Sequence, residues 1–167
     1  MSQSKGTSTE KIFSGPARLA MKLGTTAHAE VYRATGGKLF GRMGKSPILL
    51  LNTVGRKTGK ERTTPLLYVV DGEDFAIVAS AGGAPKHPAW LLNLQANPET
   101  SIEVGGRKMY VRAEVATPEE KPRLWSKLTE MYSTYDDYQK KTDREIPVVI
   151  LHPMDKRRSW EKHREDH

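Results

Sequence analysis

The chain has 167 residues, of which 37% are hydrophobic and 28% are charged, as expected for one soluble globular domain. It contains no cysteine, which excludes disulfides, thiolate metal sites and cysteine nucleophiles. The net charge of +7 favours an anionic partner: nucleic acid, an anionic membrane surface or a polyanionic small molecule. No apolar run reaches the ~18 residues of a membrane-spanning helix, and residues 1–10 lack the apolar core of a signal peptide, so we expect a cytoplasmic protein.

The N-terminal part divides into two segments. Residues 1–10 are polar, and we expect them to be disordered. Residues 11–35 carry apolar side chains at helical spacing and predict a helix, which a basic, glycine-rich loop follows up to residue 45. Cations punctuate this helix, so peripheral contact with a membrane is an alternative to the commoner outcome, packing on the protein's own sheet.

The rest of the chain predicts short strands separated by helices. Asp71-Gly72 and Gly105-Gly106 are tight-turn signals. Thr117 and Glu120 form a capping box that opens a helix running to Met131, and another helix is expected at 87–97. These patterns predict an α+β, barrel-like domain of mainly antiparallel strands over residues 46–153, followed by a charged tail at 154–167. The six strands are expected at 47–54, 63–71, 74–81, 100–104, 107–116 and 146–151.

A basic turn lies between the first two expected strands, at Val54-Gly-Arg-Lys-Thr-Gly-Lys-Glu-Arg62. Four cations in this segment face a single acid, and its glycines allow backbone N–H groups to approach a ligand. The segment could therefore hold a phosphate or a carboxylate. Taken alone, it fits a solvated turn better.

The sequence gives little support for a metal site, a serine nucleophile or a nucleotide-binding P-loop. The histidines have no metal-ligand spacing, Ser80 lacks a nucleophile elbow, and the basic turn lacks the P-loop spacing. The aromatic and basic patterns of common nucleic-acid modules are also absent, so no nucleic-acid partner is expected. Tyr132, Tyr135 and Tyr138 recur every three residues, which on one helix would keep them near one face, as core packing or as the wall of an apolar pocket.

Four linked motifs give the chain a specific resemblance. Thr53–Leu66, Ala79–Trp90, Leu92–Pro98 and Met131–Tyr138 follow the same order as in the deazaflavin-dependent nitroreductase family. That family resembles flavin-binding split β-barrels but uses the deazaflavin coenzyme F420, which carries a phosphate and an oligoglutamate tail. The resemblance covers about residues 46–152 and implies a split β-barrel with flanking helices.

The resemblance also implies roles for individual residues. The basic turn would hold the anionic end of the coenzyme, the Ser80 loop and the following helix would hold the phosphate and the deazaflavin edge, and the tyrosines would border the acceptor. A basic residue often follows the serine in this family, but Ala81 stands here, so Lys86 or Lys60 would have to compensate. The implied catalytic residues are Ser80, Tyr132, Tyr135 and Tyr138. The implied cofactor-binding residues are Arg56, Lys57, Thr58, Gly59, Arg62, Thr64, Pro65, Ala79, Ser80, Gly82, Gly83, Lys86, Pro88, Trp90 and Asn93.

The expected function is therefore hydride transfer from reduced F420 to an electron-poor acceptor such as a quinone, a nitroaromatic or an activated enone or lactone. The cofactor carries the difficult chemistry, while the protein binds and orients it. Two alternatives stay open: an F420 carrier with little turnover, and a split barrel that uses flavin mononucleotide. The resemblance fits either a monomer or a homodimer.

Overall fold

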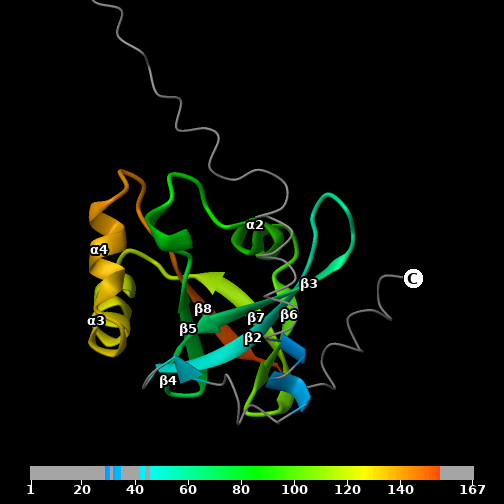
Figure 1. Ribbon diagram of the computed structural model, residues 1–167. Coiled ribbons are helices and arrows are strands. Elements are labelled where there is room, and N and C mark those ends of the chain that lie inside the picture. The colour runs from blue at the N-terminus through cyan, green and yellow to red at the C-terminus, as the bar shows by residue number, and fades with distance from the viewer. Residues whose placement is uncertain (1–28, 31, 35–41, 44–45, 155–167) are drawn as a thin grey trace, which may run out of the picture.

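The strands form one curled antiparallel sheet (Figure 1). The structure is a computed structural model that describes residues 29–30, 32–34, 42–43 and 46–154. Within these residues the sheet order is β1-β2-β6-β7-β8-β5-β4, and β3 pairs with β2. The strands are β1 (Arg42–Met43), β2 (Ser46–Val54), β3 (Glu61–Leu67), β4 (Val69–Asp71), β5 (Asp74–Val78), β6 (Glu99–Val104), β7 (Arg107–Val115) and β8 (Val148–Pro153).

The curl of the sheet follows from its pairing. β3 and β4 are separated only by Tyr68, yet β3 pairs with β2 near one end of the sheet path and β4 pairs with β5 at the other. A flat sheet would hold these two partners far apart, so the sheet has to curve round until its ends approach. The result is the split half-barrel that the resemblance implies.

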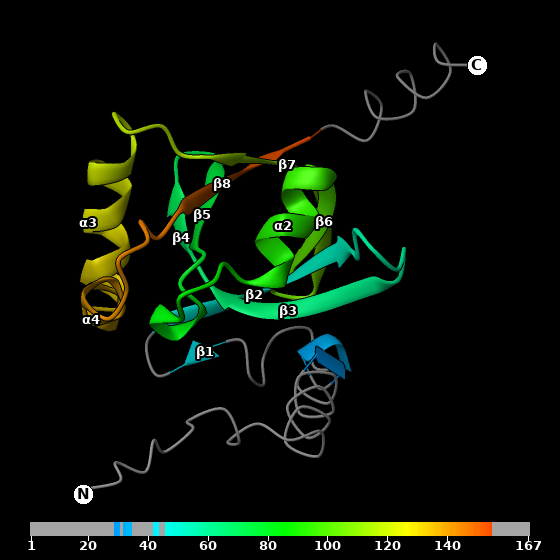
Figure 2. The same cartoon turned by 90° about the horizontal axis from the view of Figure 1, so that it is seen from above.

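Between residues 46 and 154, three α-helices and one short 3₁₀ helix accompany the barrel. They are η2 (Ala81–Gly83), α2 (Ala89–Ala96), α3 (Lys121–Met131) and α4 (Thr134–Lys140). Figure 2 shows α3 and α4 stacked beyond the edge of the sheet formed by β4 and β5, while α2 lies near β6 and β2. Residues 29–30 and 32–34 are also helical. In the described part of the chain, no helix has the length and apolar character needed to cross a membrane.

Alternating side chains of the same strands fill two apolar cores. Val149 and Leu151 of β8 face the barrel interior, where they join Leu49 and Leu51 of β2. Val148 and Ile150 of the same strand point to the other face and pack against α3 and α4. Because side chains alternate along a strand, the unbroken apolar run 148–151 shows that both faces of β8 are covered. Burying those faces holds α3 and α4 against the barrel.

The strands and helices predicted beyond residue 46 are present, with shifted ends. The expected strand 63–71 is broken at Tyr68 into β3 and β4, and the strand expected at 74–81 ends at Val78, where η2 follows. The two-residue strand β1 was not predicted. The hydrogen bonds of the predicted capping box are present, because Thr117 Oγ1 accepts from the Glu120 backbone N–H at 3.2 Å and Glu120 Oε1 accepts from Thr117 N–H at 3.3 Å. They lie in the turn before α3, whose N-cap is Glu120 without a side-chain cap hydrogen bond, so the helix begins later than predicted. The expected segment 1–10, most of the expected N-terminal helix and almost all of the charged tail lie outside the described residues.

Candidate functional site

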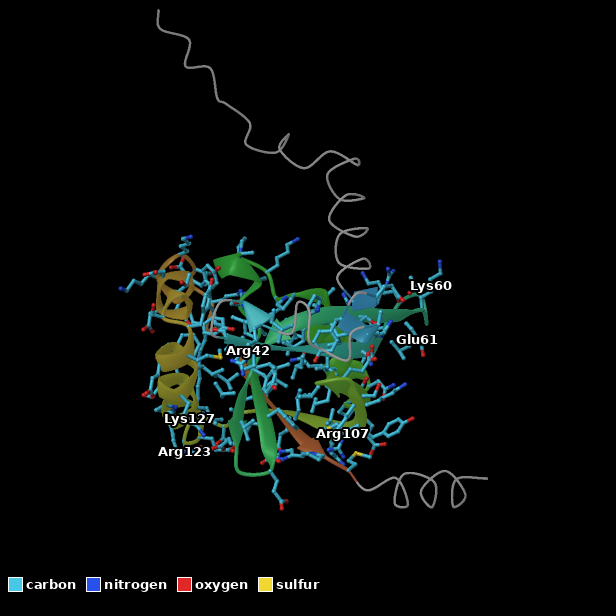
Figure 3. All side chains as sticks on the ribbon, turned by 60° about the horizontal axis from the view of Figure 1, so that its bottom comes forward. Arg42, Lys60, Glu61, Arg107, Arg123 and Lys127 are labelled. Atoms are coloured by element: carbon cyan, nitrogen blue, oxygen red, sulfur yellow. The ribbon has the colours of Figure 1, made fainter. Side chains whose placement is uncertain are left out.

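The turn between β2 and β3 presents cations to solvent. Its backbone is closed by Gly55 N–H, which donates to the Lys60 carbonyl at 2.8 Å, and by Gly59 N–H, which donates to the Gly55 carbonyl at 2.8 Å. Figure 3 shows Lys60 on this outlying hairpin. None of its four cations forms an ion pair with a residue of the described chain, so their charges remain available to a ligand. These exposed cations are Arg56, Lys57, Lys60 and Arg62.

The shape of the turn depends on two of the predicted residues. Gly59 has a φ of 68°, a left-handed conformation that glycine adopts without steric cost. Thr58 Oγ1 accepts from the Lys60 backbone N–H at 3.3 Å and stabilises the bend. Thr64 and Pro65 lie further along β3, half-buried, opposite Leu51 and Leu50 of β2. Thr58 and Gly59 therefore shape the turn, as predicted, while Thr64 and Pro65 belong to the strand behind it.

Asn93 of α2 ties this turn to the body of the protein. Its side-chain oxygen accepts from the Arg56 backbone N–H at 3.1 Å and from the Arg56 guanidinium at 3.4 Å. Its amide group donates to Thr53 Oγ1 at 3.4 Å, and the residue is only 5% exposed. Asn93 thus positions Arg56 directly. A direct contact between Asn93 and the cofactor stays a prediction.

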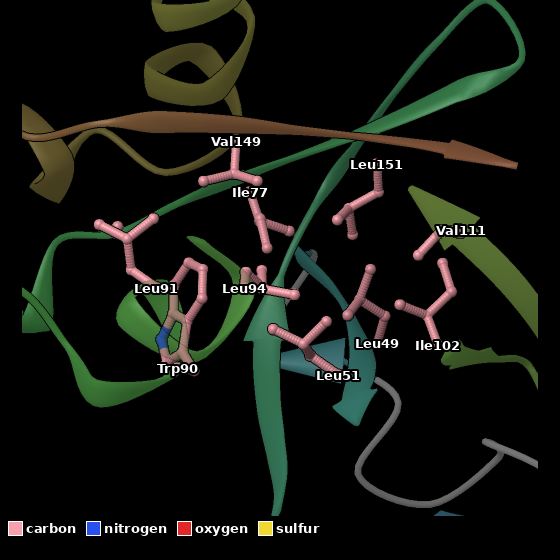
Figure 4. Close-up of a cluster of buried hydrophobic side chains, with 11 residues drawn as sticks. Leu49, Leu51, Ile77, Trp90, Leu91, Leu94, Ile102, Val111, Val149 and Leu151 are labelled. Carbon is pink, nitrogen blue, oxygen red and sulfur yellow. The ribbon is translucent and has the colours of Figure 1, made fainter. Parts of the chain in front are cut away.

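The Trp90 side chain packs in the barrel core and is largely shielded from solvent. It is 8% exposed, and Figure 4 shows its indole ring among Leu91, Leu94, Leu51 and other core side chains. Pro88 precedes α2 in an extended conformation, and its carbonyl accepts from Leu91 N–H at 3.1 Å. Lys86 is exposed beside them. Trp90 therefore anchors the start of α2 in the barrel core. Its contact with a cofactor ring stays a prediction.

The loop that follows β5 has an unusual backbone. Ala81, Gly82 and Gly83 have consecutive φ values of 46°, 64° and 80°, all in the left-handed region. Glycine adopts this region freely, but alanine pays a steric cost there, so the surrounding structure must hold Ala81 in place. A Cβ added to Gly82 would meet no atom within 4 Å, so the surface at this residue is open. Ser80 is buried just before the bend, and Ala79 N–H donates at 2.9 Å to the carbonyl of Pro147, the residue just before β8.

Arg144, which was not among the predicted site residues, holds this loop through its backbone carbonyls. Its guanidinium donates to the carbonyls of Ala79, Ser80 and Ala84 at 2.8–3.2 Å and contacts His87 Nδ1 at 3.1 Å. Arg144 lies in the connection between α4 and β8, about sixty residues from the loop. No sequence pattern marks a lone arginine that binds backbone carbonyls so far away in the chain.

The three tyrosines form one cluster, but they do not share one helix. Tyr132 caps the C-terminus of α3, whereas Tyr135 and Tyr138 belong to α4. The helix is interrupted at Tyr132 and Ser133, and the chain turns there. The ring centroids are 5.0 Å apart for Tyr132 and Tyr135, 6.4 Å for Tyr132 and Tyr138, and 6.3 Å for Tyr135 and Tyr138.

Only part of this cluster is open to a substrate. Tyr135 is 5% exposed, and burial raises the pKa of its phenol far above the ordinary value. Tyr138 is half-buried, and its pKa is raised first by a hydrogen bond with Tyr132 and then by burial. Both pKa values are raised, so the phenols of Tyr135 and Tyr138 keep their protons at neutral pH. Tyr138 is the better-exposed donor of the two.

Contacts gather the predicted residues along one side of the molecule. Figures 1 and 2 show α4, η2, α2 and the β2–β3 hairpin in that order across it. Asn93 joins α2 to the hairpin, while a Cβ on Gly83 would lie 2.8 Å from the Tyr138 carbonyl, which shows how closely the loop meets α4. No described contact links the hairpin cations directly to the tyrosines. The arrangement is a row with a cationic end and a phenolic end.

Elsewhere, a cavity of about 490 Å³ opens on the outer side of the sheet. It contains none of the predicted site residues. Its lining comes from Asn52, Thr53, Val54, Glu61, Glu99, Thr100, Ser101, Lys108, Tyr110 and Met154. Among the described residues, no three histidine, aspartate or glutamate side chains are grouped to hold a metal ion.

Comparison with known proteins identifies the family. A family model described as F420H(2)-dependent quinone reductase matches residues 25–153. The chain belongs to this family. It is 44% identical over 128 residues to the F420H(2)-dependent quinone reductase Rv1261c of Mycobacterium tuberculosis, an alignment that covers 74% of this chain and 86% of the relative.

Solved structures agree with this assignment. A structure of an F420-H2 dependent reductase (FDR-A) is 43% identical, with a TM-score of 0.59, and the match covers 64% of this chain and 94% of that one. A structure described as a domain-swapped dimer is 36% identical, with a TM-score of 0.62, over 83% of this chain and all of that one. The protein is thus an F420-dependent oxidoreductase with a split-barrel fold, and both the carrier and the flavin mononucleotide alternatives are set aside.

The residues present fit the coenzyme. A phosphate and an oligoglutamate tail need cations that are not already neutralised, and the hairpin offers four of them. A flat ring needs backbone that it can approach closely, and the left-handed loop at Gly82 is open in this way. Arginine suits bidentate contact with phosphate and carboxylate, while lysine acts as a compact charge.

Proposed function

We propose that this reductase converts a quinone to a hydroquinone at the row of residues between the hairpin and α4. Arg56, Lys57 and Arg62 would hold the acidic tail of the coenzyme at the cationic end. Ser80 and the left-handed loop would hold its head group, and Tyr132 and Tyr138 would border the acceptor. The observation that carries this proposal is the set of exposed cations, without ion-pair partners among the described residues, at the end of a row that also contains an open glycine loop.

Bound F420H2 supplies a hydride. Reduction of a quinone to a hydroquinone consumes one hydride and one proton, so a proton source is required beside the acceptor. Tyr138 fits this role because it is partly exposed and its raised pKa keeps the phenol protonated. Tyr135 is too deeply buried to approach the acceptor and would support the other two rings.

The cationic grip can be tested with a pair of charge-matched variants. The test variant replaces Arg56, Lys57 and Arg62 with glutamine. The control replaces the three exposed cations of β7, Arg107, Lys108 and Arg112, with glutamine and so lowers the net charge equally. The affinity for oxidised F420 is measured by fluorescence titration, and turnover by the oxidation of F420H2 with a soluble benzoquinone.

We expect the hairpin variant to bind F420 at least about a hundredfold more weakly, because several charge-assisted hydrogen bonds are lost together. The β7 control should change by less than about threefold, since it alters only the long-range field. Equal losses in the two variants would show that net charge, and not the hairpin, attracts the coenzyme. Unchanged binding in the hairpin variant would refute the proposed site.

The assembly also enters this proposal. A homodimer is the first oligomer to test, because a 36% identical relative is described as a domain-swapped dimer. Light scattering after size-exclusion chromatography separates it from the monomer.

A further inference from the structure

Arg144 donates most of its hydrogen bonds to carbonyls of the loop after β5. Arginine has five N–H donors. Nε donates to the Ala84 carbonyl at 2.8 Å, and one terminal nitrogen donates to the carbonyls of Ala79 at 3.2 Å and Ser80 at 2.8 Å. The other terminal nitrogen donates to the Ala79 carbonyl at 3.2 Å and lies 3.1 Å from His87 Nδ1. All five donors of Arg144 therefore have partners in the segment between β5 and α2.

These contacts fix the direction of the N–H groups on the other side of the loop. In a planar trans peptide, the C=O and N–H bonds point in opposite directions. Because the carbonyls of Ala79 and Ser80 point at Arg144, the N–H groups of Ser80 and Ala81 point away from it. Neither N–H group has an acceptor in the described part of the chain. They are adjacent donors at a right-handed residue, Ser80 with a φ of −79°, followed by a left-handed one, Ala81 with a φ of 46°. Backbone that passes from right-handed to left-handed in this way forms anion-binding concavities.

The contact with His87 extends the clamp to the residue that precedes the N-cap of α2. Arginine has only donors, so a terminal nitrogen of Arg144 is the donor in the 3.1 Å contact with His87 Nδ1. His87 also leads into α2, so one guanidinium spans the loop and the start of the helix that carries Asn93.

We propose that Arg144 is a positioning residue for the coenzyme: by clamping three carbonyls, it turns the Ser80 and Ala81 N–H groups toward an oxygen of bound F420. This inference rests on the proposed function and adds a residue to the same site. The oxygen acceptor belongs to either the phosphate or the ring carbonyls of the coenzyme. We expect lysine to be a poor replacement for Arg144, because its donors all lie on one nitrogen, whereas the carbonyls of Ala79, Ser80 and Ala84 are bound by three separate guanidinium nitrogens.

The test uses the full-length protein and amide NMR spectra. Wild type, Arg144→Ala, Arg144→Lys and Arg123→Ala are titrated with oxidised F420 and, separately, with inorganic phosphate. Arg123 is the matched control because it also makes multiple hydrogen bonds, to Asp71, but lies on α3 away from the loop. The affinity is measured by fluorescence, and the amide signals of Ser80 and Ala81 are compared with those of Lys57 and Thr58 in the hairpin.

In the wild type we expect F420 to shift all four amides. Shifts of Ser80 and Ala81 with phosphate as well would assign the acceptor to the phosphate, and shifts with F420 alone would assign it to the ring. Both Arg144 variants should lose the loop shifts, keep the hairpin shifts and bind F420 at least about tenfold more weakly, as expected when one or two hydrogen bonds to an anionic ligand are lost. Arg123→Ala should bind within about twofold of wild type.

The outcomes separate this inference from the function on which it rests. If F420 shifts the hairpin amides but not those of Ser80 and Ala81, or if Arg144→Lys binds as wild type does, Arg144 has no positioning role. If neither the loop nor the hairpin responds in the wild type, the proposed site itself is wrong. Should Arg144→Ala fail to fold, Arg144→Lys and the wild-type amide shifts still decide the matter.

Discussion

Gly83 lies directly against the backbone of Tyr138. A Cβ built on Gly83 would stand 2.8 Å from the Tyr138 carbonyl oxygen, 3.2 Å from its Cα and 3.1 Å from the Cβ of Lys141. Two of these three atoms belong to the backbone and cannot rotate away. The loop after β5 and the helix α4, which carries Tyr135 and Tyr138, therefore meet at a point where only glycine fits.

We expect Gly83→Ala to separate the loop from α4. The new methyl group overpacks the contact, at about 1–3 kcal/mol, and the φ of 80° adds about 1 kcal/mol of strain. Gly82→Ala is the matched control, because it has a similar φ of 64° and no atom near the added Cβ. The free energy of unfolding from urea titration should fall clearly further for Gly83→Ala than for Gly82→Ala. Equal losses of unfolding free energy in the two variants would mean that the loop shifts to accommodate the added methyl group at Gly83.

The amide of Asn93 should matter for stability and for the hairpin together. Asn93→Ala removes the acceptor of the Arg56 N–H and the donor to Thr53 in a nearly closed environment, so we expect a loss of about 1–3 kcal/mol in the free energy of unfolding. Gln95→Ala on the exposed side of the same helix should change it by less than about 0.5 kcal/mol. F420 affinity should fall only for Asn93→Ala, because Arg56 loses its support. Unchanged affinity in a destabilised Asn93→Ala protein would limit the role of Asn93 to folding.

The features predicted from sequence are those that local chemistry determines. The Thr117–Glu120 capping box, the glycine turn at Gly59 and the alternating strands depend on nearby residues, and the structure contains all three. The family motifs carried the cofactor assignment, which composition alone left open among three kinds of anion. In each of these cases, the order and spacing of residues along the chain were enough to make the prediction.

The features that were missed depend on distant contacts. The three-residue spacing of the tyrosines is compatible with one helix, and only the break at Ser133 moves Tyr132 onto a different element. Tyr68 looks like a strand residue, yet the curl of the barrel interrupts the strand there. Arg144 acts on carbonyls some sixty residues away, and every residue type offers a carbonyl, so no pattern of side chains could reveal its partners.

The tyrosine cluster predicts a graded effect on turnover. Tyr138→Phe removes the more exposed proton donor and should lower kcat for benzoquinone reduction by about tenfold or more. Tyr135→Phe removes a buried hydroxyl and should lower kcat much less. Because the pKa of Tyr138 is raised above 10.0, the wild-type rate should show no basic limb below that pH. Equal kcat values for Tyr138→Phe and wild type would assign the proton to water.

The turn between β4 and β5 provides a pH-dependent contribution to stability. Asp71 accepts from Arg123 at 2.6 and 2.9 Å and from Lys127 at 3.3 Å, and Figure 3 shows both cations on α3. These contacts, Arg123 first, lower the pKa of Asp71 from 3.8 to about 2. Because the folded state holds the carboxylate more strongly than the unfolded state does, the contribution is complete above about pH 4 and is lost as the pH falls toward 2.

We therefore expect Asp71→Asn to lower the free energy of unfolding by about 1 kcal/mol at pH 7, a value discounted because the partner cations are exposed to solvent. The difference from wild type should shrink between pH 4 and pH 2, because protonation then removes the same charge from the wild-type side chain. Asp143→Asn, at an exposed carboxylate without an ion pair among the described residues, should stay within about 0.5 kcal/mol of wild type throughout. Urea titrations at each pH supply these free energies. A gap between Asp71→Asn and wild type that stays constant down to pH 2 would mean that Asp71 stabilises the turn by shape and hydrogen bonding rather than by its charge.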